Sequence, residues 1–143
     1  MVFSNSLHHV PEALRLPALR EAARVVKSGG HVFVAEPMPG GAHKDLLAPV
    51  QDETEVQAHA YRVIQDAAGH GLRQLREDIF ERESFYRDFD HFRDAMCRVD
   101  PNRAAAFTEH DADLRRRFAT LGRAKNAGRA FDQPIRINVL VKG

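Results

Sequence analysis

The sequence predicts a single α/β domain, and three segments carry this prediction. An amphipathic helical segment begins near Pro11 and ends at Gly29-Gly30. A nearly continuous apolar run follows at residues 31–36, and such runs are typical of strands buried on both faces of a parallel sheet. Near the end of the chain, residues 135–141 alternate between apolar and polar and then become apolar, which predicts a further strand.

Composition excludes several classes of protein. Of the 143 residues, 43% are hydrophobic and 29% are charged, so the chain is neither disordered nor membrane-spanning. There is no apolar run near the ~20 residues of a spanning helix, and no secretory signal is expected. The single cysteine, Cys97, excludes an intrachain disulfide, and a net charge of +1 gives no reason to expect a nucleic-acid partner. We therefore expect a cytoplasmic protein without membrane or nucleic-acid partners.

The first part of the chain reads as strand, helix and strand. Residues 2–5 are short and partly apolar, as at the end of a buried strand. Pro11 suits a first helical turn, where its missing N–H has no intrahelical partner. Pro17 interrupts the helical pattern and predicts a broken or late-starting helix. Arg15 falls between the apolar positions and is expected on the solvated side, and Gly29-Gly30 closes the helix.

The middle of the chain is predicted to be mainly helical. Residues 37–41 are rich in proline and glycine and predict a loop. Apolar residues at helical spacing then predict helices over residues 51–69, 90–98 and 103–125. A charged stretch around residues 79–86 fits either an edge strand or an extended arm.

Three consecutive segments resemble the second half of the class I S-adenosylmethionine-dependent methyltransferases. They are SLHHVP at residues 6–11, ALREAARVVKSGG at residues 18–30 and VFVAEP at residues 32–37. The small-molecule branch of that family has a strand, an LHH turn, a helix ending in EAARVLKPGG and a strand ending in EP, in this order. RINVLVK at residues 136–142 is similar to the antiparallel last strand of the family. The resemblance implies a partial Rossmann-like methyltransferase sheet of about four strands, mixed, with the last strand antiparallel, flanked by helices.

The resemblance also implies how the chain is organised. Residues 1–143 would form a single truncated methyltransferase-like domain. It would comprise a strand-helix-strand core at residues 1–41, a mainly helical acceptor-side or lid region at 42–130 and a C-terminal strand at 131–143. The family's sheet order is 3-2-1-4-5-7-6, of which this chain would keep only 4-5-7-6.

A sheet of that kind has an open edge at residues 2–5, beside an uncovered apolar face. Natural proteins pair or cover such edges. We therefore expect a homodimer, a domain swap, or docking onto a polypeptide that supplies the missing half.

By resemblance, the function is methyl transfer from S-adenosylmethionine to a small-molecule acceptor. The family binds its cofactor mainly through a glycine-rich turn and ribose-binding acidic residues in its first half, and residues 40–41 lack the spaced glycines of such a turn. We therefore expect the isolated chain to be inactive. The alternative is a non-catalytic, oligomerising binding or assembly module derived from a methyltransferase. A third alternative, RNA association through a basic helix, carries less weight.

Candidate site residues lie where the first predicted strand gives way to a loop, since open α/β sheets bind ligands at that end. The resemblance implies that this turn lies beside the methionine part of the cofactor, through Asn5, Ser6 and Leu7. The catalytic candidates are His9 and, next to it, His8. A histidine with a pKa near neutrality can act as a general base toward an acceptor hydroxyl or amine. The alternative is that both histidines only form hydrogen bonds across the turn.

Glu36 and Pro37 end the next strand and are the candidate substrate-binding residues. Glu36 can orient either an acceptor or a histidine. Alternatively it caps a helix N-terminus or the amides of Gly40-Gly41.

Metal and nucleophile sites are not indicated. The eight histidines show no paired spacing such as HxxxH, so no zinc site is expected. Cys97 is expected to be a packed helix cysteine. The basic stretch at residues 115–129 is expected to be a solvated face balanced by acidic residues, rather than a phosphate-binding surface.

Overall fold

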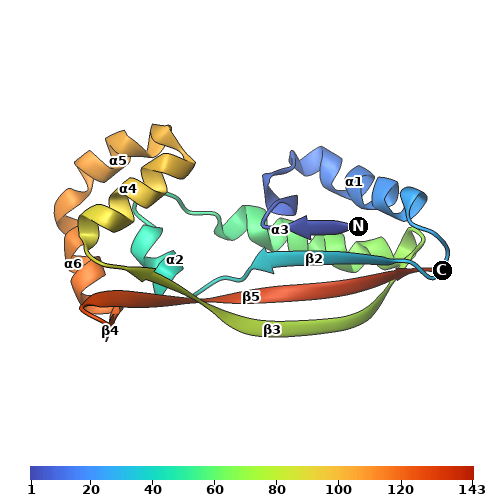
Figure 1. The fold of residues 1–143 in the computed structure, drawn as a ribbon. Coiled ribbons are helices and arrows are strands. Elements are labelled where there is room, and N and C mark those ends of the chain that lie inside the picture. The colour runs from blue at the N-terminus through green and yellow to red at the C-terminus, as the bar shows by residue number, and fades with distance from the viewer. The chain divides into compact units, whose positions relative to one another are not determined.

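A computed structural model describes all 143 residues, Met1–Gly143, and contains one five-stranded sheet (Figure 1). The strand order is β1-β2-β5-β3, and β4 pairs with β5. β1 (Val2–Ser4) runs parallel to β2 (His31–Pro37), and β2 runs antiparallel to β5 (Gly128–Lys142). β3 (Leu72–Tyr86) forms the other edge, which confirms the edge-strand alternative. The predicted α/β class and mixed sheet are confirmed, and the order is the 4-5-7-6 order that the resemblance implied.

The chain divides into two compact units. The first unit comprises Met1–Pro39, Glu53–Phe80 and Pro134–Gly143. The second unit comprises Gly40–Asp52 and Glu81–Gln133. No helix in the chain is both long and apolar enough to cross a membrane.

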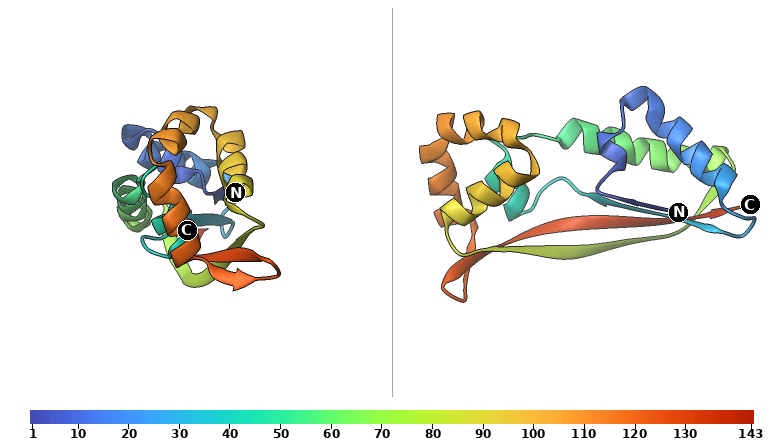
Figure 2. Two further views of the ribbon diagram at one scale, coloured as in Figure 1. Left: turned by 90° about the vertical axis from the view of Figure 1, so that its left-hand side faces the viewer. Right: turned by 45° about the horizontal axis from the view of Figure 1, so that its top comes forward.

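In the first unit, two helices pack on the same face of the sheet. They are α1 (Glu12–Val25) and α3 (Thr54–Asp66), and Figures 1 and 2 show both on one side of β1 and β2. Short 3-10 turns precede α1 and follow α3, as η1 (Leu7–His9) and η2 (Ala67–Gly69). The buried core between helices and sheet includes Leu19, Val32, Val34, Ile64 and Leu140.

The prediction that the second strand is buried on both faces was wrong. β2 alternates, with Val32 and Val34 fully buried, while the side chain between them, Phe33, is 42% exposed. The physical reason is that α1 and α3 cover only one face of β1 and β2 (Figures 1 and 2). Val2 is the register partner of Phe33 and is 66% exposed. The first unit therefore has the open β1 edge and the uncovered apolar face that the resemblance implied.

The prediction of a helix broken at Pro17 was also wrong. α1 runs without interruption from Glu12 to Val25 with Pro17 inside it. A proline inside a helix removes one main-chain hydrogen bond. Burial of Leu19, Ala22 and Ala23 against the sheet stabilises the helix despite that loss.

The second unit is helical and has its own aromatic core. Its helices are α2 (Ala42–Leu47), α4 (Phe89–Val99), η3 (Pro101–Arg103), α5 (Ala104–Glu109) and α6 (Asp111–Leu121), and α4 to α6 run from yellow to orange in Figure 2. The buried core residues are Leu46, Tyr86, Phe89, Phe92, Phe107, Leu114, Phe118 and Phe131. The predicted helix at residues 90–98 is thus confirmed as α4. The predicted helix at residues 51–69 is confirmed as α3 of the first unit.

The prediction of a single helix over residues 103–125 was wrong. The helix breaks at His110, whose φ of −104° and ψ of 18° are not helical, and it ends before Gly122. A Cβ on Gly122 would lie 2.6 Å from Cζ of Phe131, so the chain must pass this ring closely. β4 (Arg123–Lys125) follows and turns into β5 through Asn126-Ala127, both with positive φ, as in a two-residue hairpin.

Candidate functional site

The turn after β1 places the predicted residues at the carboxyl end of that strand. The Asn5 amide donates to the carbonyl of Ala35 at 2.8 Å, which extends the pairing of β1 with β2. Leu7 is completely buried in the core of the first unit and anchors η1. The turn therefore lies beside the end of β2, where Glu36 is found.

Glu36 holds this turn through three hydrogen bonds. Its Oε1 accepts from the amides of Ser6 and Leu7, at 3.1 and 2.8 Å. Its Oε2 accepts from Nδ1 of His8, and both side chains are more than 90% buried. Because an ionised carboxylate only accepts hydrogen bonds, Nδ1 of His8 must carry a proton. Glu36 thus caps the amides at the start of η1 and also orients the ring of His8.

The second ring nitrogen of His8 faces another carboxylate. Nε2 lies 3.6 Å from Oε2 of Glu53, the residue before α3. Burial by itself lowers the pKa of His8, but the hydrogen bond to Glu36 and the nearby negative charges of Glu36 and Glu53 outweigh it and raise that pKa to about 9. Without a bound cation, His8 is therefore protonated on both ring nitrogens at neutral pH and cannot accept a proton from a bound molecule.

His9 differs from His8 in exposure and partners. Its side chain is exposed, and its ring centroid lies 4.0 Å from that of His8. One ligand atom from each of His8, His9 and Glu53 lies within 4.8 Å of the others. Of the two histidines, the exposed His9 is the one free to exchange a proton with a bound molecule.

Arg15 supports the turn from α1, although the sequence predicted it on the solvated side. It is only 3% exposed. Its Nη2 donates to the carbonyl of His8 at 2.8 Å, and its Nε donates to the carbonyl of Val10 at 2.9 Å. The spacing of apolar residues could not reveal this burial, because a guanidinium can be buried when backbone carbonyls accept its hydrogen bonds.

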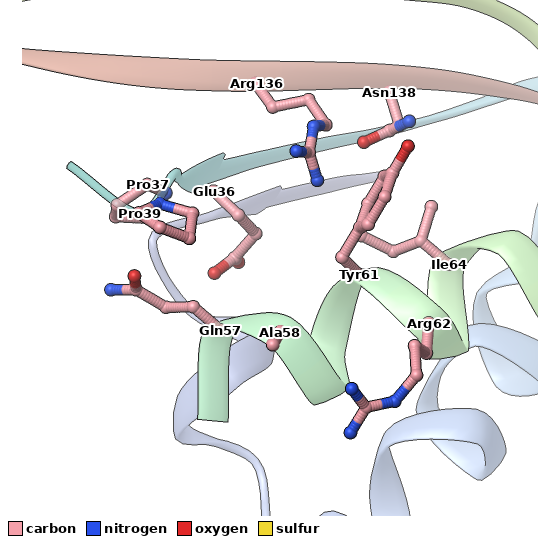
Figure 3. A pocket seen from close by; sticks show the side chains of 10 residues that line it. All are labelled: Glu36, Pro37, Pro39, Gln57, Ala58, Tyr61, Arg62, Ile64, Arg136 and Asn138. Carbon is pink, nitrogen blue, oxygen red and sulfur yellow. The ribbon is translucent and has the colours of Figure 1, made fainter. Parts of the chain in front are cut away.

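A cavity of about 230 Å³ lies between α3 and the strands β2 and β5 (Figure 3). Glu36 and Pro37 line it from β2, and Gln57 and Tyr61 line it from α3. The two predicted substrate-binding residues therefore share one cavity. Its walls are mostly carbon, with a few polar groups.

Arg136 and Asn138 line the same cavity from β5. The guanidinium of Arg136 stacks over the ring of Tyr61, 3.5 Å from the centroid, and Figure 3 shows the two side chains facing each other. Its buried Nε has no hydrogen-bond partner, and Oε1 of Glu77 lies 3.8 Å from it. Asn138 donates to Oε2 of Glu77 at 2.7 Å. The cavity thus combines an aromatic wall with a guanidinium that can donate to an acceptor oxygen.

Sequence reasoning singled out the residues on the turn and on β2, and missed Glu53, Arg15, Tyr61 and Arg136. These belong to other elements, and no local motif marks them. The basic stretch lies outside this site. In α6, Arg115 pairs with Asp111 at 2.9 Å and Arg117 pairs with Asp113 at 2.8 Å.

Comparison with known proteins shows a likeness in fold only. No family model matches the sequence, and no curated protein matches it. The crystal structure of a "putative methyltransferase" from Bacillus halodurans C-125 is similar, with a TM-score of 0.54 and 13% sequence identity. The match covers 99% of this chain and 62% of that chain, so this chain spans less than two thirds of that protein. The fold is therefore methyltransferase-like.

Proposed function

We propose that this chain forms the acceptor-binding side of a class I S-adenosylmethionine-dependent methyltransferase that acts on a small molecule. The observation that carries the proposal is the gathering of His8, His9 and Glu36 at the carboxyl ends of β1 and β2, next to a cavity. Open α/β sheets bind their ligands at that end. The likeness of the fold to the Bacillus halodurans protein supports the same proposal.

The residues of this chain do not by themselves fit the whole cofactor. The amides of Ser6 and Leu7 are already bonded to Glu36, and that of Asn5 to β2. Gly40 follows β2, but a Cβ added there would meet nothing within 4 Å, so the loop is not a closed cradle. The contacts to ribose and adenine are proposed to come from residues of a second copy that do not form the family's glycine-rich turn.

A few residues are proposed to bind the acceptor and to remove its proton. The cavity of about 230 Å³ suits a small, largely apolar acceptor, with the Arg136 guanidinium directed to one of its oxygen atoms. His9 is proposed as the general base that takes the proton from the acceptor hydroxyl or amine. Glu36 acts as a positioning residue, since it fixes His8 and the turn on which His9 lies. These groups contribute mainly by orientation.

A second copy of the chain is the proposed partner along β1. The outer edge of β1 has no neighbouring strand, and exposed Val2 and Phe33 lie side by side next to it. Two copies can pack these apolar faces against each other about a two-fold axis beside the β1 edge, which covers both faces at once.

The test combines calorimetric titration of the full chain with S-adenosylhomocysteine and sedimentation at the same concentrations. We expect a dimer with micromolar affinity for S-adenosylhomocysteine, and we expect Phe33→Glu to lose both properties. Phe80→Glu is the matched control, because Phe80 is 45% exposed but lies on β3, away from the β1 edge.

Three results would overturn parts of this proposal. A stable dimer that binds no S-adenosylhomocysteine contradicts methyl transfer and favours the non-catalytic assembly module. A strict monomer contradicts the second copy and points to a different polypeptide as the partner. Equal effects of the two phenylalanine substitutions contradict the β1 edge as the interface.

A further inference from the structure

Side chains of η1 and of the residue before α3 form a donor set of a kind that binds metal ions. His8 and His9 come from η1, and Glu53 lies directly before α3. One donor atom from each lies within 4.8 Å of the other two. Two imidazoles and one carboxylate are ligands for zinc, iron(II) and neighbouring divalent transition metals.

His8 is held as a metal-ligating histidine usually is. Its Nδ1 donates to Glu36, whose other oxygen accepts from the amides of Ser6 and Leu7. Histidine ligands almost always donate their second ring N–H to a carboxylate or carbonyl, which fixes the ring and the tautomer. In this arrangement Nε2 of the buried His8 is the atom directed away from Glu36 and toward Glu53.

The separation of Nε2 from Glu53 suits ligands of one ion. The two atoms are 3.6 Å apart, which is longer than a hydrogen bond. Two ligands that each lie about 2.1 Å from a tetrahedral ion are about 3.4 Å from each other. The carboxylate is supported from α3, since Nε2 of Gln57 donates to the same oxygen of Glu53 at 3.2 Å.

We infer that His8, His9 and Glu53 form a binding site for one divalent transition-metal ion, with Glu36 as the carboxylate that orients His8. The ion takes the place of the proton on Nε2 of His8, because a histidine ligand must be neutral at the coordinating nitrogen. Three protein ligands leave at least one coordination position open, as in catalytic metal sites. Glu36 and Gln57 each contact a ligand and also line the 230 Å³ cavity. An oxygen atom of a bound molecule can therefore be the remaining ligand. The inference does not rest on methyl transfer, and in the metal-bound protein His9 is a ligand and does not act as the general base proposed above.

The spacing of histidines along the chain gave no reason to expect such a site. That argument considered neighbouring histidines only, whereas Glu53 follows His9 by 44 residues and is brought to it by the packing of α3 against η1.

The test is calorimetric titration of the metal-free full chain with zinc chloride, without any adenosyl compound. We expect one equivalent to bind with micromolar affinity or tighter. His9→Ala and Glu53→Gln should each weaken the affinity about tenfold or more. His9 is exposed and Gln is nearly isosteric with Glu, so both variants should keep the wild-type circular dichroism spectrum. His31→Ala is the matched control, because His31 is an exposed histidine of the same unit.

Cobalt(II) provides a second readout through its visible absorption. We expect saturable bands at one equivalent for the wild type and for His31→Ala, and their loss in Glu53→Gln. Three results overturn the inference: no saturable zinc binding below about 1 mM, affinity unchanged in both His9→Ala and Glu53→Gln, or an equal loss in His31→Ala. Since no adenosyl compound is present, failure here is distinct from failure of the proposed methyl transfer.

Discussion

Replacing Glu36 with glutamine tests the central interaction of the site. The carboxylate of Glu36 accepts hydrogen bonds from two backbone amides and from His8, and only 7% of the residue is exposed. Glutamine keeps the shape of the side chain but replaces one acceptor oxygen with an NH₂ group. One of the three donors then faces another donor and loses its partner.

The expected cost follows from these contacts. A buried donor left without a partner costs about 1–3 kcal/mol, and hydrogen bonds to a charged group are worth about 1.5–3 kcal/mol. Removing one member of a buried ion pair costs about 3–5 kcal/mol when the other stays charged. Because glutamine still accepts some of the hydrogen bonds, we expect Glu36→Gln to lower the free energy of unfolding by about 2–4 kcal/mol.

Urea denaturation at pH 7, followed by circular dichroism, measures this loss. Glu21→Gln is the control, because Glu21 also pairs with a cation, Arg24, but both side chains are more than half exposed. Exposed pairs contribute little, so this variant should unfold like the wild type. A loss below about 1 kcal/mol in Glu36→Gln would refute the argument that this carboxylate holds the turn.

Two further predictions concern the second unit. Burial, followed by the positive charge of Arg82, lowers the pKa of His43 to about 4, so the unfolded chain binds more protons than the folded chain between pH 6.5 and 4. The stability that neutral His43 contributes is complete above pH 6.5 and is lost as the pH falls to 4, by up to about 3 kcal/mol. Urea denaturation of His43→Gln should therefore show a weaker dependence on pH than the wild type. The exposed control His31→Gln should keep the pH dependence of the wild type. Gly122→Ala should lower stability by about 1–3 kcal/mol in the same assay, since its Cβ would meet a Phe131 carbon at 2.6 Å. Gly69→Ala, whose Cβ would meet nothing within 4 Å, should lose nothing, and equal losses in the two glycine variants would contradict the packing argument.

The sheet was predictable because its signals are local. The apolar run of β2 is bounded by glycines on one side and by Pro37 on the other, and the end of β5 alternates along its own sequence. The order of the strands came from the resemblance, since spacing within a strand says nothing of its neighbours.

Elements that depend on tertiary packing were not predictable in the same way. The segment after Arg103 has helical composition up to Leu121, but the chain leaves the helical conformation at His110 and again at Gly122, which passes close to Phe131. The apolar sequence of β2 predicts burial on both faces, but Phe33 is exposed because helices cover only one face of this strand (Figure 1).

The candidate site likewise contains residues that the sequence predicted and residues that it did not. His8, His9 and Glu36 follow strand ends, so the general rule for α/β sheets was enough to select them. Glu53 and Arg15 lie on helices or just before them, in charged surroundings, and only the folded chain brings them to η1. Spacing in one sequence carries no information on such contacts.

The most direct test of the account is to locate S-adenosylhomocysteine on the full chain by two-dimensional ¹H–¹⁵N NMR. We predict that saturating ligand shifts the amide signals of Asn5, Ser6 and His9, which belong to the turn after β1. Shifts confined to the second unit, or no shifts at all, would contradict the placement of the methyltransferase site at this turn.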